Sequence, residues 1–556
     1  MEIHTRAAEW YLQAGNYEEA IYHLTAAKNF DAAALALNSW GSSLLANAEL
    51  KTFERWFLEI PFEHVRGNTP LLIKASYAMI FLRRRDVLKN LISEIDSKNT
   101  SSSIDETTDQ ILLIAMSQLF EDRLTEAFQI CLDQKPSDTP GTIFSNFERG
   151  ANYNLQAFCQ LATSNFISAD HSLSLARYHS EKASAGFSAG YQTGIKFLSK
   201  ILQGRPREIL DKFYDDTYGG LNQDSSINAI SAVLAACKMW ALYEVGRISS
   251  VLVLWNRFQN EIAETGVPDF MSTAHIFASR AYVATGDYAK AFHALDTLER
   301  IALASNWERI VRLVNWERIR ISICHGKLSK ANSFKELMSG EPIFSSGWIY
   351  LSEDFDSELL GQIRLDIHNE SYVDAKKNIA KVFASTPSDR VYRVMKIQIL
   401  KALLAVRSGN EFEALRTLNE ALRTGYEGGF TQCFIDEGED VLHLLAKVLD
   451  EHKDQAFGDE NFYKYIKNIL DNSSQLPDVA FEKARKLPQN SRSLLSDKQY
   501  EMLKMLAAGL SNKDMAKKMF VSENTVKFHL KNVYSILGVA SRTQAIALAS
   551  EQGLIN

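Results

Sequence analysis

Hydrophobic and small residues recur with one fixed spacing along most of the chain. A glycine or another turn-tolerant residue is followed two positions later by a bulky apolar residue and five positions later by alanine. This pattern occurs at Gly15-Tyr17-Ala20, Asp122-Leu124-Ala127, Ser164-Phe166-Ala169, Gly286-Tyr288-Ala291, Gly326-Leu328-Ala331, Glu370-Tyr372-Ala375 and, with the apolar residue shifted by one, Gly409-Phe412-Ala414. Degenerate copies begin at Gly204 and Gly246 and have Ile209 and Val251 in the alanine position. From Asp122 onward the copies lie 39 to 44 residues apart, which predicts an internal repeat.

Each copy predicts a pair of antiparallel helices. Glycine adopts the left-handed conformation that ends the first helix at little steric cost. The bulky residue is expected to anchor the start of the second helix, and the alanine lets the two helices cross closely. Such pairs bury their apolar faces only against neighbouring pairs, so they should stack into a solenoid with a concave surface. Residues 21–121 are expected to be helical as well, although they fit the period poorly.

Composition favours a large all-α protein. Prolines, which break helix interiors, number 10 among 556 residues. Hydrophobic residues make up 46% and charged residues 23%, as in folded soluble proteins. Because one hydrophobic core supports only roughly 250–300 residues, the length predicts a repeat array or several domains.

Other features exclude several classes of protein. The five cysteines are scattered and have no metal-ligand spacing, so they predict buried thiols in a reducing compartment. Charged residues such as Glu2, Arg6 and Glu9 are not compatible with a signal peptide. The longest apolar run, residues 229–237, is too short to span a membrane. We therefore expect a cytoplasmic protein without membrane association, bound metal or cofactor.

The last part of the chain differs from the rest in charge and in its helix signals. The net charge is −7, yet the segment from Ser491 onward has nine Lys and Arg against five Asp and Glu. A basic tail on an acidic body suggests a module that faces nucleic acid. Helix starts are predicted at Ser496, Ser511, Ser522 and Ser541, three of them followed after three positions by Gln499, Asp514 and Gln544. Gly509 and Gly538 lie where the first and third of these helices should end.

The third predicted helix has two distinct faces. At 100° per residue, one face consists of Val526, Leu530, Val533 and Leu537, which should pack on the first two helices. The opposite face consists of Asn524, Lys527, Phe528, Lys531 and Ser535. By itself, such a basic face is most often only solvated.

The same segment resembles the LuxR-type helix-turn-helix. The matching residues are 495–503, 508–513, 515–516, 521–532, 537–539 and 542–545, with Lys498-Gln499 where the family often has Arg-Glu. The resemblance implies that the third helix enters the major groove of DNA. The residues expected to contact bases are Lys527, Phe528, Lys531 and Asn524. Those expected to position the domain on phosphates are Asn512, Thr525 and Arg542. In this family the fourth helix commonly pairs two modules, which implies a homodimer on DNA.

The longer part of the chain resembles tetratricopeptide repeats and, more specifically, the sensor domain of the MalT-like large ATP-binding regulators of the LuxR group. The resemblance rests on residues 7–20, 32–33, 47–61 and 429–438, where Gln432 stands in place of a frequent arginine. Those regulators normally begin with an ATPase domain that carries a Walker A loop. No GxxxxGK[ST] occurs here, and the single Gly-Lys pair, Gly326-Lys327, lies in a repeat turn. ATP binding is therefore not expected, whether the chain is a shortened regulator or a fragment of a longer one.

A repeated string gives one candidate effector site. Asn-Trp-Glu-Arg occurs at 306–309 and again at 315–318. Trp307, Arg309 and Trp316 could bind an effector by stacking and hydrogen bonding, although core packing of the tryptophan rings is the favoured interpretation. No catalytic constellation is recognisable, so no enzymatic activity is expected.

Together these patterns predict three parts. Residues 1–470 form a tetratricopeptide-like sensor, residues 471–493 a linker, and residues 494–556 a four-helix LuxR-type domain. The leading hypothesis is a bacterial, sequence-specific transcription regulator whose sensor binds a small molecule or a regulatory protein and whose further partner is RNA polymerase. The alternative is an interaction scaffold with a constitutive DNA-binding tail, or an antagonist of a full-length ATPase-containing regulator.

Overall fold

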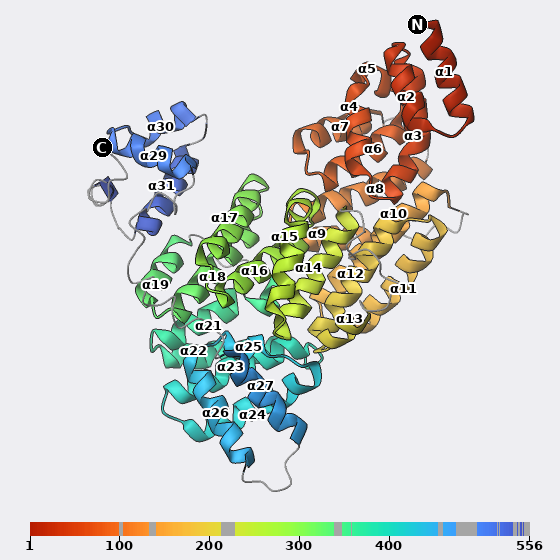
Figure 1. The fold of residues 1–556 in the computed structure, drawn as a ribbon. Helices are drawn as coiled ribbons and strands as arrows, with labels where there is room; N and C mark the ends of the chain where they lie inside the picture. Colours follow the sequence, from red (N-terminus) through yellow and green to blue (C-terminus); the bar gives the residue numbers. More distant parts are fainter. Residues whose placement is uncertain are drawn as a thin grey trace.

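The structure is a computed structural model, and its regular elements are all helical (Figure 1). It describes residues 1–98, 104–132, 141–212, 228–338, 347–356, 358–453, 460–473, 497–519, 521, 523–537, 542, 545–546 and 549. Within these ranges no strand is formed, so the predicted all-α fold class is confirmed. Figure 1 shows the helices stacked side by side along a curved path, with α29–α31 next to the array.

Helices follow one another along the described part of the chain. The first part contains α1 (Glu2–Gln13), α2 (Tyr17–Ala26), α3 (Phe30–Ala46), α4 (Leu50–Glu59), α5 (Phe62–Val65), α6 (Thr69–Phe81), α7 (Arg85–Lys98), α8 (Ile104–Phe120) and α9 (Leu124–Leu132). The middle part contains α10 (Ile143–Ala162), α11 (Phe166–Lys182), α12 (Gly186–Leu202), α13 (Pro206–Lys212), α14 (Ala229–Glu244), α15 (Ile248–Thr265), α16 (Pro268–Ala284), α17 (Tyr288–Ala304), α18 (Glu308–Cys324) and α19 (Leu328–Leu337).

The remaining helices complete the array and form the last domain. They are α20 (Ser352–Phe355), α21 (Glu358–His368), α22 (Tyr372–Ser385), α23 (Val391–Arg407), α24 (Glu411–Gly428), α25 (Gln432–Ile435), α26 (Glu439–Lys453), α27 (Glu460–Ser473), α29 (Asp497–Ala507), α30 (Asn512–Met519) and α31 (Glu523–Leu537). Because α27 extends to Ser473, the first three residues of the predicted linker are helical, and residues 474–493 lie outside the described residues. The predicted domain boundaries stay predictions.

The repeat pattern corresponds to the turns between helices. The first residue of every copy has φ between +57° and +81°, namely Gly15, Asp122, Ser164, Gly204, Gly246, Gly286, Gly326, Glu370 and Gly409. In each copy the next helix begins two positions later. The alanine position is completely buried in all copies, including Ile209 and Val251. One detail was wrong: α24 begins at Glu411, and Phe412 is 80% exposed, so this aromatic does not anchor its helix.

The array returns to itself after one superhelical turn. The Trp307 indole donates to the carbonyl of Phe120 at 2.7 Å, and the Thr431 backbone N–H donates to the carbonyl of Glu244 at 2.6 Å. In both contacts the partners are 187 residues apart. Side chains inside the superhelix are therefore enclosed by helices from two successive turns.

A large apolar core runs through the array, a small separate cluster lies between α18, α19 and α21, and α29–α31 have a core of their own. Among the described residues, no helix is both long and apolar enough to cross a lipid bilayer.

Candidate functional site

The last three helices pack around a compact apolar cluster. Met502, Leu503 and Leu506 of α29 meet Met515 of α30, and α31 covers both helices. Val526, Leu530 and Val533 are at most 3% exposed, so the predicted inward face of α31 is confirmed at these positions. The predicted fourth helix is described only at residues 542, 545, 546 and 549, which are helical, and Ala545 and Ala549 join the same cluster.

The turn between α29 and α30 has the predicted capping geometry. Ser511 Oγ accepts a hydrogen bond from the backbone N–H of Asp514 at 3.2 Å, and its hydroxyl donates to the Asp514 carboxylate at 2.5 Å. Gly509 has φ +80° and follows the end of α29 as predicted. The other predicted signals, at Ser496, Ser522, Gly538 and Ser541, lie outside the described residues.

The predicted recognition face of α31 presents two lysines. Lys527 and Lys531 are four positions apart and both exposed, and Thr525 is half-buried near the start of the helix. The side chains of Asn524 and Phe528, also predicted to contact bases, lie outside the described residues. A major groove accommodates an α-helix with such exposed donors.

Two of the predicted DNA contacts have partners inside the protein. Lys531 Nζ donates to the carbonyl of Leu337 at the end of α19, at 3.1 Å. Arg542 Nη2 donates to the carbonyls of Leu506 and Leu510, both at 3.0 Å, and thereby ties the last segment to the end of α29. Asn512 is half-buried at the first position of α30. Phosphate positioning by Asn512, Thr525 and Arg542 stays a prediction.

The structure buries all three residues of the predicted effector site. Trp307 and Trp316 are 0% and 1% exposed, and Trp316 Nε1 donates to Glu358 at 3.0 Å. The Arg309 guanidinium pairs with Asp122 and Asp269, so it links α18 to the preceding superhelical turn. Since protein groups already engage these polar atoms, effector binding there stays a prediction.

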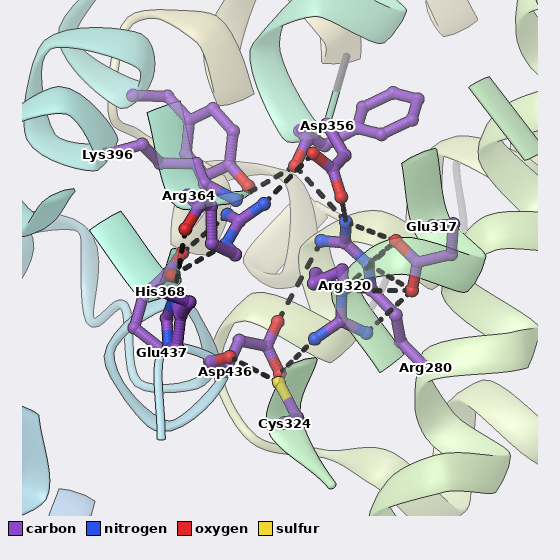
Figure 2. Close-up of polar contacts among 12 residues, drawn as sticks. Arg280, Glu317, Arg320, Cys324, Asp356, Arg364, His368, Lys396, Asp436 and Glu437 are labelled. Carbon is purple, nitrogen blue, oxygen red and sulfur yellow. Dashed lines mark hydrogen bonds and ion pairs between the residues drawn. The ribbon is translucent and has the colours of Figure 1, made fainter. Parts of the chain in front are cut away.

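The sequence patterns did not indicate a buried ion network that lies inside the superhelix (Figure 2). Arg280 of α16 and Arg320 of α18 both bind Glu317, with Nη2-to-carboxylate distances of 2.8 and 2.6 Å. Figure 2 shows Arg364 of α21 between two carboxylates, where it binds Glu437 at 2.7 Å and Asp356 at 3.1 Å. These pairs connect α16, α18, α20, α21 and the segment after α25.

Arginines keep two buried carboxylates of this network ionised, those of Glu317 and Glu437. Burial opposes ionisation of Glu437, but the charge and hydrogen bonds of Arg364 outweigh it and lower the pKa of Glu437 to about 2. Burial likewise opposes ionisation of Glu317. The charges and hydrogen bonds of Arg280 and Arg320 outweigh this effect and lower the pKa of Glu317. A sequence signal existed, since α18 carries Arg309, Arg312, Arg318 and Arg320 between Ile, Val and Trp residues.

Comparison with known families agrees with both parts of the structure. Residues 493–549 match the model of bacterial regulatory proteins, luxR family, and residues 259–451 match the MalT-like TPR region. The second match contains the whole ion network described above. Neither of these two models describes an ATPase domain.

Related proteins extend this similarity along the chain. The HTH-type transcriptional regulator AlkS of Pseudomonas putida is 23% identical over 579 residues, and AlkS of Ectopseudomonas oleovorans is 21% identical over 569 residues. Each alignment covers 99% of this chain and 61% of the AlkS protein. The HTH-type transcriptional regulator MalT of Vibrio cholerae is 27% identical over 161 residues, 28% of this chain and 18% of MalT. The chain thus spans less than two thirds of the length of these relatives.

Fold and matches together define a helical-repeat protein with a LuxR-type helix-turn-helix domain. The chain contains a MalT-like TPR region followed by a LuxR-family domain, and it is homologous to AlkS over nearly its whole length. The predicted resemblance to the MalT-like regulators of the LuxR group is confirmed.

Proposed function

We propose that this chain regulates transcription by binding double-stranded DNA through α31, under the control of its helical repeats. The exposure of Lys527 and Lys531 on the outer face of α31, in a domain that matches the LuxR family, carries the proposal. Lysine ammonium groups donate to guanine O6 and N7 or to phosphates. Two such domains paired on an inverted repeat, with RNA polymerase as a further partner, complete the proposed assembly.

The test is DNA binding by the full chain, using a duplex that the wild-type chain has enriched from a random-sequence pool. Lys527→Ala and Lys531→Ala should each weaken binding by about 1–3 kcal/mol where the lysine contacts a base. Lys376→Ala removes an equally exposed lysine from α22 of the repeats and should leave affinity unchanged. Binding should also weaken steeply with salt, because phosphate contacts release counterions. Full affinity in both α31 variants would refute this recognition face.

The contact between Lys531 and Leu337 supports control by the repeats over the constitutive-tail alternative. While its ammonium group donates to this carbonyl of α19, Lys531 has fewer N–H donors left for a base or a phosphate. An effector that releases the domain must bind the released state more tightly than the docked state. In this scheme the repeats hold the recognition helix until a small molecule or a regulatory protein binds them.

The two hypotheses differ in how the isolated domain behaves. Residues 491–556 are expected to fold alone because α29–α31 have their own core, which circular dichroism can check. Under the regulator hypothesis this segment and the full chain bind the selected duplex with different affinities, and the difference depends on an effector or a cell extract. Equal affinity under all conditions would favour the scaffold with a constitutive DNA-binding tail.

A further inference from the structure

An apolar cavity lies inside the superhelix where two successive turns meet. It is partly open to solvent, and its walls come from α6, α8, α10, α12 and the start of α16. Six aromatic rings line it, those of Phe81, Phe147, Phe158, Phe187, Tyr191 and Phe270.

Two buried polar atoms in this cavity have no hydrogen-bond partner among the described residues. Asn154 is 5% exposed, and its Nδ2 donates to the carbonyl and the hydroxyl of Ser188 at 2.8 and 3.2 Å. Because a carbonyl only accepts, this contact fixes the amide orientation and leaves Oδ1 as an unpaired acceptor. The residue Tyr191 is 9% exposed, and its hydroxyl is the second unpaired group.

These two atoms define what a ligand must offer. Buried polar groups are normally hydrogen-bonded, and leaving them unpaired costs free energy. Oδ1 of Asn154 requires a donor, whereas the Tyr191 hydroxyl can donate to an oxygen. A hydroxyl group offers both functions, because its O–H donates and its oxygen accepts. The largely apolar walls favour a neutral ligand, because they could not compensate for the lost hydration of a charged one.

We propose that this cavity binds a neutral, single-ring phenol. Its ring would pack edge-to-face among the surrounding aromatic rings, an arrangement like that of Phe81 and Phe187, whose centroids are 4.7 Å apart with a 62° interplanar angle. Its hydroxyl would donate to Asn154 Oδ1 and accept from Tyr191. The inference names an effector class for the proposed regulator, so its regulatory part rests on the proposed function.

The position of the cavity gives such a ligand a way to act on the superhelix. Phe81, Phe147 and Tyr191 belong to one turn, whereas Phe270 of α16 and Val267 directly before this helix belong to the next. Arg83, next to α6, also reaches the second turn, where its guanidinium donates to the carbonyl of Gly266. A molecule between these elements contacts both turns, so its affinity depends on how closely they approach. Occupancy therefore biases the pitch of the array.

The test compares two probes of nearly equal size on the full chain. 4-Methylphenol carries the hydroxyl and toluene lacks it, and binding of each is measured by calorimetry and by saturation-transfer NMR. Saturable binding is expected for 4-methylphenol, with toluene about tenfold weaker because it leaves both polar atoms unpaired. Absence of saturable 4-methylphenol binding, or equal affinity for both probes, would overturn the proposal.

Single hydroxyl removals locate the site. Tyr191→Phe should weaken 4-methylphenol binding about 5- to 10-fold and leave toluene binding unchanged, since only a hydrogen bond is lost. Tyr178→Phe makes the same change at an exposed position of α11 and should alter neither affinity. Retained helicity and urea midpoint would show that each variant is folded. If Tyr191→Phe binds 4-methylphenol like the wild type, the Tyr191 hydroxyl does not contact the phenol, and the assignment of this cavity as its binding site fails.

DNA binding is measured separately, so the two proposals can fail separately. Binding of the selected duplex without any phenol tests the proposed function alone. A chain that binds DNA but not 4-methylphenol retains the function and loses the effector class. A chain that binds 4-methylphenol without any effect on DNA affinity retains the site and loses its regulatory role.

Discussion

Two regions of the superhelix hold their helices together by different means. In the first, α6, α8, α10 and α12 meet the start of α16 through aromatic and aliphatic side chains, and the packing leaves an unfilled cavity. In the second, α16, α18, α21 and the segment after α25 meet through buried arginine–carboxylate pairs (Figure 2). The two regions share α16, whose Phe270 faces the cavity and whose Arg280 joins the network.

The difference concerns how precisely each region must be packed. Apolar burial is non-directional, so rings can adjust to a change in volume at modest cost. A buried ion pair is favourable only while its geometry and all its partners are kept, because an uncompensated buried charge is expensive. We therefore expect the ion-paired region to fix the register of the helices and the aromatic region to be the deformable one.

Removing one carboxylate from the network should have the largest effect on stability. Glu317→Gln leaves Arg280 and Arg320 facing a neutral amide inside the protein, where all three side chains are at most 3% exposed. Loss of one partner of a buried pair typically costs about 3–5 kcal/mol. The urea midpoint, followed by far-UV circular dichroism, should therefore fall strongly.

A matched control lies on the surface of the same array. Glu411→Gln removes a carboxylate that pairs with Lys447, where both side chains are more than half exposed, and should hardly move the midpoint. If Glu317→Gln were as mild as Glu411→Gln, the network would not fix the register, and the contrast between the two regions would be lost.

Acid should weaken the protein in two pH windows. His275 of α16 is completely buried, and burial lowers its pKa to about 4 from the ordinary 6.5. The unfolded chain therefore takes up the proton first, and the stability due to neutral His275, on the order of 3 kcal/mol, is lost as the pH falls from 6.5 to 4. Glu437, with its pKa near 2, contributes stability above pH 4.5 that is lost as the pH falls towards 2.

Urea unfolding between pH 7 and pH 4 measures the first window. His275 Nδ1 donates to the carbonyl of Met271 at 2.9 Å, and His275→Asn retains an amide N–H for this bond. The variant should lose less stability on acidification than the wild type. An identical pH dependence in both proteins would assign this window to other histidines. One of these is His325, because burial also lowers the pKa of its side chain to about 4.

The sequence predicted those features of the fold that depend on local backbone chemistry. Left-handed turns and close helix crossings restrict residue type within a few positions, which is why every copy of the pattern marks a turn with positive φ. Residues 21–121 fit the period poorly because several of their turns place other residues in that conformation, namely Lys28, Ala48 and Arg83. Such residues carry no turn signal in a single sequence.

Contacts between superhelical turns could not be predicted in this way. Arg309 and Asp122 are 187 residues apart, and nothing local to either residue indicates its partner. For the same reason the string Trp307-Glu308-Arg309 suggested a ligand site, while the cavity lined by Phe81, Tyr191 and Phe270 escaped notice. In the DNA-binding domain, the sequence pattern predicted the exposed lysines of α31. It did not predict that Arg542 donates a hydrogen bond to a carbonyl of the same domain.

Adding one methyl group should be costly in the ion-paired region. Gly361 lies on α21 against the indole of Trp316, and a Cβ built there would overlap the ring. Because Trp316 is itself held by Glu358, the ring has little freedom to move. Gly361→Ala should therefore destabilise the protein by about 1–3 kcal/mol, seen as a lower urea midpoint. An unchanged midpoint would mean that this region is as deformable as the aromatic one.

A larger side chain should be tolerated in the aromatic region. Its effect on stability is the smallest that we expect. Ala151 of α10 lines the cavity, and Ala151→Leu adds three carbon atoms on the side that faces this partly open space. Filling apolar space gains burial without overlap, so stability should stay unchanged or rise by up to about 1 kcal/mol. The same leucine should weaken binding of 4-methylphenol, because it occupies the volume intended for the ring. A fall in the urea midpoint comparable to that of Gly361→Ala would show that the cavity walls are as rigidly packed as the ion network, and the two regions would then differ in chemistry but not in their tolerance of change.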